Sequence, residues 1–228
     1  HNIDFSRINF IKAPVGKGSN FLERLFFLKS FDTLFYLTDG SIFFSTAKIS
    51  YLHFQVPFPN TSAKSLWGRF KLSSWKMAIY NSQFTKEYIE KDWPIKGKVI
   101  YPPVSVNLFK PLSKKKQIVS VGRFFGFLKD KKQGLLIDVF KSLVDENKLN
   151  DWSLHLVGAV SDGDKNYLEE LINKAKGYNI FIHPNLSFND LKKLYGESSI
   201  YWHAMGFDEN DPTKMEHFGI TIVEAMVS

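Results

Sequence analysis

The second half of the chain alternates between short apolar runs and longer segments in which apolar residues recur every three or four positions. A short apolar run bounded by glycine or proline is typical of a buried strand, and the longer spacing is typical of an amphipathic helix. The predicted strands are Gln117–Val121, Trp152–Val157, Asn179–Ile182 and Ile200–Ala204. The predicted helices are Gly134–Val144, Tyr167–Ala175, Asp190–Tyr195 and Phe218–Met226.

This alternation of strands and helices predicts an α/β fold with a parallel, doubly wound sheet. Ligands of such sheets bind beyond the carboxyl ends of the strands. The loops that leave those ends begin at Gly122, Gly158, Pro184 and Met205. Side chains in these loops are therefore the first candidates for a binding site.

The first half of the chain has a less regular pattern. Leu66–Tyr80 is predicted to form one basic amphipathic helix, with Trp67, Phe70, Trp75 and Ile79 as its apolar residues. Prolines and a run of lysines interrupt the pattern around Pro111, so we place a domain boundary there, between residues 1–110 and 111–228. The other elements expected in this half are the strands Thr33–Leu37, Lys48–Phe54 and Lys98–Tyr101 and the helix Phe84–Lys91.

The net charge of +7 on the 228 residues lies in the first half of the chain. Residues 1–110 hold 15 Lys and Arg against 7 Asp and Glu, whereas residues 111–228 hold 15 against 16. A basic surface either keeps a protein soluble or faces an anionic partner such as a membrane surface or nucleic acid. We expect peripheral membrane contact through the Leu66–Tyr80 helix, and no nucleic acid, because the sequence has no RNA-binding aromatic motif or zinc finger.

Cysteine is absent, which excludes disulfides and thiolate metal sites and favours a reducing compartment such as the cytoplasm. No apolar run reaches the roughly 18 residues of a membrane-spanning helix. The chain begins at His1 without a methionine, and we expect it to be part of a longer protein or a natural truncation.

The loop after the first predicted strand of the second half combines glycines with cations. Gly122 and Gly126 allow the backbone to approach a ligand closely. Arg123 can grip phosphate oxygens with two parallel hydrogen bonds, and Lys131 can add a point charge. An ordinary basic loop between strand and helix is the alternative interpretation.

The loop and helix after Met205 carry two carboxylates in an apolar stretch, Glu216 and Glu224. The backbone N–H groups of Phe218, Gly219 and Ile220 stand at a predicted helix start, where they favour a diphosphate. Eight helical residues rise about 12 Å, so the two carboxylates can reach a sugar at each end of that diphosphate. Alternatively, Glu216 is only a charge at a helix N-terminus and Glu224 a surface residue.

An acidic run at residues 208–211, Asp-Glu-Asn-Asp, invites interpretation as a metal site. The run lies in a polar loop with no further ligands near it in the sequence, so we expect no metal.

Four segments in order resemble the retaining glycosyltransferases of family 4, which have the GT-B fold of two Rossmann-like domains. Residues 216–226, EHFGITIVEAM, are similar to the E-x7-E signature of that family. VGRF with KKQGLLIDVF, and WSLHLVG, are similar to the first strand, first helix and second strand of its donor domain. NSQFTKEYIEKDWPIKGKVIYPPVSVNLFKP resembles the end of the acceptor domain and the linker, and the resemblance covers roughly residues 48–228.

The resemblance implies a role for each matching residue. Arg123 and Lys131 would neutralise the donor diphosphate as it leaves, with Lys132 as the alternative to Lys131. Glu216 would contact the transferred sugar, and Glu224 the ribose. The backbone N–H groups of residues 218–220 would bind the diphosphate, and His53 would face the sugar from the acceptor domain.

The expected function is transfer of a hexosyl unit, with retention, from a nucleotide sugar such as a UDP- or GDP-hexose. The acceptor would be a lipid-linked or polysaccharide hydroxyl at the inner face of the membrane, and no metal cofactor would be needed. The start of the acceptor domain and the end of the donor domain of that family have no counterpart in these 228 residues. A glycosidase with paired carboxylates and a non-enzymatic nucleic-acid-binding module remain as alternatives.

Overall fold

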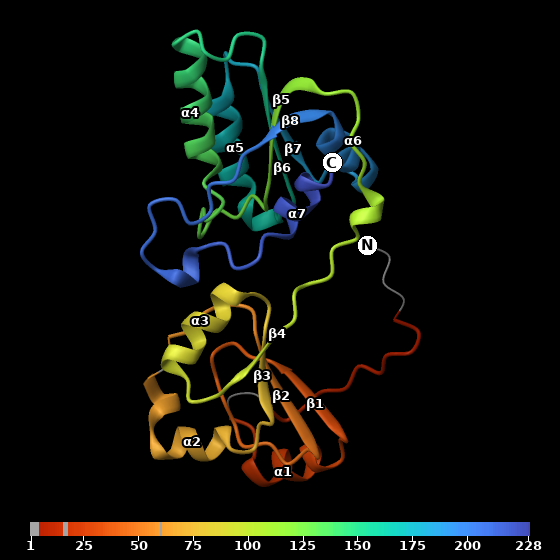
Figure 1. Ribbon diagram of the computed structural model, residues 1–228, viewed down its shortest axis with the longest axis vertical. Coiled ribbons are helices and arrows are strands. Elements are labelled where there is room, and N and C mark those ends of the chain that lie inside the picture. The colour runs from red at the N-terminus through yellow and green to blue at the C-terminus, as the bar shows by residue number, and fades with distance from the viewer. Residues whose placement is uncertain (1–4, 16–17, 60) are drawn as a thin grey trace. The chain divides into compact units, whose positions relative to one another are not determined.

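A computed structural model of the chain describes residues 5–15, 18–59 and 61–228. The chain forms two compact units, residues 1–101 and residues 102–228, and each has a parallel four-stranded sheet (Figure 1). We call them unit 1 and unit 2 and describe each by itself. The α/β class and the parallel sheet expected from the sequence are confirmed.

The division falls at 101/102, before the expected boundary at 110/111, because the connecting segment packs onto unit 2. Phe109 is buried there with its ring edge-on to Tyr195, at 5.8 Å between centroids. The Leu112 N–H donates to the Gly196 carbonyl at 3.0 Å. A Cβ on Gly196 would come within 2.6 Å of the Lys110 carbonyl oxygen, so the glycine allows this close approach.

The strands of unit 1 pair in the order in which they occur in the chain, β1-β2-β3-β4. The strands are β1 (Thr33–Leu37), β2 (Ile49–Phe54), β3 (Met77–Tyr80) and β4 (Gly97–Val99). The helices are α1 (Phe21–Lys29), α2 (Leu66–Leu72) and α3 (Gln83–Asp92), with a 3₁₀ turn η1 (Thr61–Lys64).

One predicted element of unit 1, the helix over Leu66–Tyr80, is wrong. The helix α2 ends at Leu72, and the Ser73 N–H donates back to Arg69 while the Ser74 hydroxyl donates to the Lys71 carbonyl. Met77–Tyr80 is instead a strand between β2 and β4, and three of its four residues are buried. Serine hydroxyls that compete for backbone groups end helices, and the apolar run after them is short enough for a buried strand.

The core of unit 1 gathers apolar side chains from its helices on the β2–β3 part of the sheet. Leu52 and Phe54 of β2 and Ala78 and Tyr80 of β3 are fully buried in it. Alternate residues of β1, among them Phe35 and Leu37, are exposed. The helices contribute Leu28, Leu72, Ile89 and Trp93.

The strands of unit 2 pair in the order β7-β6-β5-β8, so the chain starts in the sheet interior and reverses direction. The strands are β5 (Lys115–Val121), β6 (Ser153–Gly158), β7 (Ile180–Pro184) and β8 (Ser198–Tyr201). The helices are α4 (Gln133–Asp145), α5 (Lys165–Ala175), α6 (Phe188–Glu197) and α7 (Ile220–Met226). The 3₁₀ turns are η2 (Val106–Leu108), η3 (Asp162–Asp164) and η4 (Pro212–Lys214).

Unit 2 has a core on each face of its sheet, as the alternation of strand residues requires. Ile118, Leu154 and Leu156 face a core with α4 and α5, whereas Val119 and Val157 face a second core with α6 and α7. Helices α4 and α5 accordingly lie side by side, apart from α6 and α7 (Figure 1). Burial on both faces explains why the interior strand β6 has a mainly apolar sequence.

The reversal of strand order lies between β6 and β8, which pair with opposite edges of β5. At such a reversal, loops from neighbouring strands lead away to opposite faces of the sheet and leave a crevice at the carboxyl ends. The loops concerned are residues 122–132, after β5, and residues 202–219, after β8. They are the two loops that the sequence marked out.

Candidate donor-binding site at the end of the second sheet

The loop after β5 begins with a glycine that two neighbours require. A Cβ on Gly122 would lie 2.7 Å from Cγ of Lys131, so the lysine stem crosses directly over the glycine. A Cβ on Gly158 would lie 2.1 Å from the Gly122 carbonyl oxygen. Two glycines on adjacent strands therefore let the loop fold back until Lys131 stands over the end of β5.

Gln133 fixes the backbone of this loop and was not predicted as a site residue. Its side chain is only 3% exposed, and Nε2 donates to the carbonyls of Gly122 at 3.2 Å and Arg123 at 3.0 Å. The buried hydroxyl of Tyr167 donates to its Oε1 at 3.1 Å. All polar groups of the amide thus have partners, which makes the loop conformation costly to change.

The two loops meet at an ion pair between Lys131 and Glu216. Lys131 Nζ donates to Glu216 Oε2 at 2.9 Å, and the two side chains are 25% and 22% exposed. Burial raises the pKa of the Glu216 carboxyl, but the hydrogen bond and charge of Lys131 outweigh burial and hold the pKa below its ordinary value. Glu216 is therefore ionised at neutral pH and Lys131 has a local counter-charge.

Two further residues from the loop after β8 lie beside the pair, and sequence analysis missed both. Met205 Sδ lies 2.9 Å from Lys131 Nζ. His203 Nε2 lies 3.5 Å from Glu216 Oε2 and is buried without a hydrogen bond of good geometry. Burial lowers the pKa of His203, opposed by the charge of Glu216. A polar atom left in this condition beside a carboxylate is suited to bind an added oxygen.

Lys132, the alternative to Lys131, has different partners. Its Nζ donates to the Glu209 carboxylate at 2.9 Å and also to the Phe207 carbonyl. Its backbone is in the left-handed region, with φ of 51°, which turns its side chain away from that of its neighbour. Lys132 thus anchors the loop after β8, whereas Lys131 contacts Glu216.

Arg123 is exposed, and no described contact joins its side chain to the Lys131–Glu216 pair. Its guanidinium lies 5.7 Å from the ring centroid of Phe125, and its charge helps to lower the pKa of Asp164. Asp164 in turn accepts from the Gly126 N–H at 2.9 Å. The backbone around Arg123 is fixed at both ends, and its side chain extends into solvent.

The turn from Glu216 to Ile220 is shaped by Gly219. Its φ of 78° is in the left-handed region, and a Cβ there would lie 2.6 Å from Cδ1 of Ile222. The Phe218 N–H interacts with the Glu216 carboxylate and helps to lower its pKa, so this N–H has a partner within the protein. Gly219 is the N-cap of the seven-residue α7, which begins at Ile220, two residues after the predicted start at Phe218.

Glu224 is 8% exposed, so the alternative interpretation as a surface residue is wrong. Its Oε2 accepts a hydrogen bond from the Tyr195 hydroxyl at 3.2 Å. Burial raises the pKa of Glu224, and the hydrogen bond from Tyr195 opposes this rise. The two carboxylates of the motif therefore have different environments, one paired with a cation and the other with a buried phenol.

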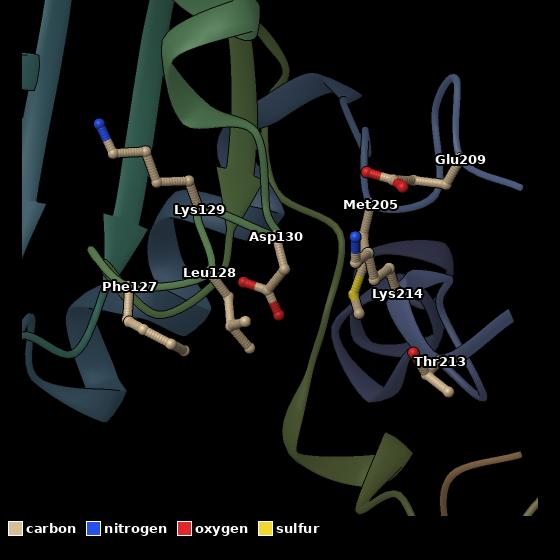
Figure 2. Close-up of a pocket in the computed structure, with 8 residues that line it drawn as sticks. All are labelled: Phe127, Leu128, Lys129, Asp130, Met205, Glu209, Thr213 and Lys214. Carbon is tan, nitrogen blue, oxygen red and sulfur yellow. The ribbon is translucent and has the colours of Figure 1, made fainter. Parts of the chain in front are cut away.

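A cavity of about 260 Å³ lies between the same two loops (Figure 2). One side consists of residues 127–130 from the loop after β5, and the other of Met205, Glu209, Thr213 and Lys214. Met205 contacts both Lys131 and the cavity. Of the acidic run at residues 208–211, Glu209 lines the cavity and is paired with Lys132, and Asp211 caps η4.

His53 lies in unit 1, near the carboxyl end of β2. Its Nδ1 lies 3.1 Å from the Ile79 carbonyl, and since a carbonyl only accepts, this nitrogen carries the proton. Its ring is 5.2 Å from that of Phe35. The position at a strand end is the one expected, and its role stays a prediction.

Among residues 5–15, 18–59 and 61–228, no three His, Cys, Asp or Glu side chains are grouped as metal ligands would be. In the same part of the chain, no helix has the length and apolar character needed to cross a bilayer.

The sequence profile described as "Glycosyl transferases group 1" matches residues 107–228, which is more than half of the chain. The chain belongs to this family. The resemblance stated from the sequence is thereby confirmed for residues 107–228, which lie within unit 2. No curated protein gives a significant sequence match to the chain.

Solved structures extend the comparison to the fold of this group 1 glycosyltransferase chain. The structure of a GtfA/B complex matches with a TM-score of 0.56 at 17% identity, over 80% of this chain and 36% of that one. Trehalose-6-phosphate synthase matches with a TM-score of 0.48 at 11% identity, over 67% and 46%. TarM from S. aureus, solved with UDP, matches with a TM-score of 0.46 at 13% identity, over 78% and 43%.

The match to the GtfA/B complex shows the fold alone. Two parallel four-stranded sheets match GT-B glycosyltransferases over part of their length, so the fold class expected from the sequence is confirmed. The chain spans about a third of the length of that relative.

Proposed function

We propose that unit 2 binds the donor of a retaining glycosyltransferase, which moves a hexosyl unit from a nucleotide diphosphate sugar such as a UDP- or GDP-hexose to a hydroxyl. The family uses nucleotide-sugar donors, typically without a metal. The observation that carries the proposal is the Lys131–Glu216 pair at the reversal of strand order, with Arg123 on the same loop as Lys131.

In the proposed reaction, cleavage of the sugar–diphosphate bond develops negative charge on the leaving oxygens. Lys131 and Arg123 stabilise that charge more in the transition state than in the ground state, where it is spread over the bound diphosphate. Because Lys131 is already held by Glu216 and Met205, little reorganisation is needed when the donor binds.

Glu216 has a second part in the proposed complex. Its pKa is depressed, so it is an ionised acceptor for the hydroxyls of the transferred sugar. The backbone of residues 218–220 adds donors near the diphosphate once the Phe218 N–H exchanges Glu216 for a phosphate oxygen. Glu224, whose pKa is raised, holds the ribose, and Tyr195 orients its carboxyl group.

Unit 1 would supply the acceptor side, with His53 facing the sugar. We propose a lipid-linked or polysaccharide acceptor and a reaction in the cytoplasm at the inner face of the membrane. The basic composition of the first half supports an acceptor near an anionic surface.

The glycosidase alternative requires two carboxylates that face one glycosidic bond. Glu216 is bonded to Lys131 and Glu224 to Tyr195, and a glycosidase has no need of a cation beside its carboxylate. We therefore retain the transferase.

Calorimetric titration of UDP and GDP into the full chain tests the donor site. We expect at least one of them to bind, and Glu224→Ala to weaken binding about tenfold because a ribose contact is lost. Glu146→Ala, on the far end of α4, is the matched control and should bind like the wild type. Absence of binding by a folded wild-type chain contradicts the proposal.

A further inference from the structure

Helix α2 of unit 1 presents large apolar side chains to solvent. Leu66 is 89% exposed, Trp67 61% and Phe70 49%. The three occupy neighbouring positions on one face of the helix, because residues three and four apart lie on the same side. Together with Phe44, which stacks on Phe70, we call them the α2 patch.

The patch is rigid although it is exposed. Phe70 is stacked between Phe44, at 4.9 Å, and Trp67, at 5.2 Å between centroids. The opposite face of the helix is fixed by the buried Gly68 and Leu72, and the Ser65 hydroxyl caps its start by accepting from the Gly68 N–H at 3.0 Å. These apolar groups therefore protrude from a folded base.

The patch lies in a long stretch without acidic residues. From Gly40 to Lys86 the sequence has no Asp or Glu, while it has six Lys and Arg. Lys71 Nζ lies 5.9 Å from the Trp67 ring centroid, and the described carboxylates make no ion pair with it or with Arg69. The cations of this stretch are Lys48, Lys64, Arg69, Lys71, Lys76 and Lys86.

We propose that the α2 patch docks unit 1 onto an anionic lipid surface. Leu66 and Trp67 insert into the region between headgroups and acyl chains, while Arg69 and Lys71 remain among the anionic headgroups. Leu, Trp and Phe beside Lys and Arg are the combination that lies stably in a membrane interface. The proposal does not depend on the donor site of unit 2.

The chemistry of the patch favours lipid over nucleic acid. Binding of single-stranded nucleic acid relies on aromatic faces that are free to stack with bases. Both faces of Phe70 are already covered, and the most exposed member, Leu66, has no ring. The cations also argue against a second copy of the same surface, since like charges would face one another.

Sedimentation of the full chain with vesicles tests the proposal. We expect binding to vesicles of phosphatidylcholine and phosphatidylglycerol in equal amounts, and little binding to phosphatidylcholine alone. The double variant Leu66→Ser/Trp67→Ser should lower the partition coefficient by about tenfold or more, because it removes the inserted apolar surface. Lys71→Glu should lower it by about fivefold or more.

Matched controls separate the patch from general properties of unit 1. Leu22→Ser/Phe26→Ser removes two exposed apolar side chains of α1, four residues apart, and Lys98→Glu reverses an exposed charge on β4. Both should bind vesicles almost as well as the wild type. Circular dichroism of each variant checks that the fold is kept.

Three outcomes overturn the proposal. The wild type fails to bind the anionic vesicles, or the α1 control loses as much binding as the α2 variant. The third is retention of poly(U) without vesicle binding, which assigns the patch to nucleic acid instead.

Discussion

The two units have the same kind of sheet but differ in strand order and in the balance of their charges. In unit 1 the four strands follow chain order, whereas in unit 2 the order reverses at β5. Residues 1–101 hold 14 Lys and Arg against 7 Asp and Glu, and residues 102–228 hold 16 against 16. Unit 2 thus has a reversal of strand order, and both cations and carboxylates are available at its strand ends.

One ion pair from each unit makes a useful contrast in exposure. Lys131 and Glu216 of unit 2 are 25% and 22% exposed, whereas Lys48 and Asp32 of unit 1 are 75% and 82% exposed. An ion pair in water contributes little to stability. Charges that are partly withdrawn from water interact more strongly with each other and with any charged group that binds beside them. The comparison suggests that a parallel sheet alone does not create a ligand site. In unit 2 the candidate site combines a reversal of strand order with partly buried charges.

The largest effect should come from the cation of the unit 2 pair. Lys131→Met is expected to lower the rate of sugar transfer, or of donor hydrolysis, by at least about a hundredfold, because stabilisation of the leaving diphosphate is lost. Lys132→Met is the control, since that lysine contacts Glu209 and Phe207 instead. Equal losses in the two variants would contradict the assignment of Lys131.

A second prediction concerns the buried histidines of unit 2. His155 bonds to Ser153 and to His183, and burial, with the charges of His183 and Lys115, lowers its pKa from 6.5 to about 4. The unfolded chain therefore takes up this proton first, so stability falls as pH drops from 6.5 and levels off below about 4.

Between neutral pH and about pH 4, the loss of unfolding free energy should be smaller by roughly 3 kcal/mol in His155→Gln than in the wild type. Urea unfolding at a series of pH values, followed by circular dichroism, measures it. His53→Gln in unit 1 is the control for a histidine that is not deeply buried. A pH profile of His155→Gln parallel to that of the wild type would show that His155 does not carry the dependence.

A third prediction separates positioning from binding in the loop after β5. Gln133→Leu leaves the carbonyls of Gly122 and Arg123 without their donor, so we expect a loss of about 2 kcal/mol in unfolding free energy and weaker binding of UDP or GDP. Gln83→Leu is the control, because Gln83 is exposed and its amide donates to the Glu87 carboxylate rather than to a loop backbone. If donor affinity is unchanged while stability falls, Gln133 does not position the loop for binding.

The smallest effect is expected for the exposed pair of unit 1. Lys48→Ala should leave the free energy of unfolding within experimental error, because both partners are solvated. Thermal unfolding of the variant beside the wild type measures this. A clear loss would mean that the contrast between the ion pairs of the two units is drawn too sharply.

The fold of unit 2 could be predicted almost element by element. The interior strand β6 is buried on both faces from Ser153 to Val157, so it reads as a mainly apolar run between turn residues. The differences are at the ends: β8 stops at Tyr201 rather than Ala204, and α7 begins at Ile220 rather than Phe218. Residues 202–204 and 218–219 belong instead to the loop that carries the candidate site.

The failure at residues 66–80 has a physical cause. Trp67, Phe70, Trp75 and Ile79 fit one helical stripe, but the first two are exposed on α2 and the last two are buried in the unit 1 fold. Spacing alone cannot distinguish these environments, because the strand Met77–Tyr80 gains its stability from pairing with β2 and β4.

The candidate site was predictable only where its residues belong to a local motif. Arg123, Lys131 and Glu216 stand in segments that resemble a family, and the structure brings the last two together. His203 and Gln133 have no such signal, because each acts on a partner from another element. Only the structure shows that Gln133, directly after Lys132, is buried and bonded to the loop backbone.

Hydrogen–deuterium exchange of the full chain, with and without saturating UDP or GDP, is the most direct test of the donor site in unit 2. We predict slower exchange in residues 122–134 and 205–224, and no change in residues 40–86 of unit 1. A nucleoside diphosphate that binds yet leaves both unit 2 segments unprotected would contradict the account.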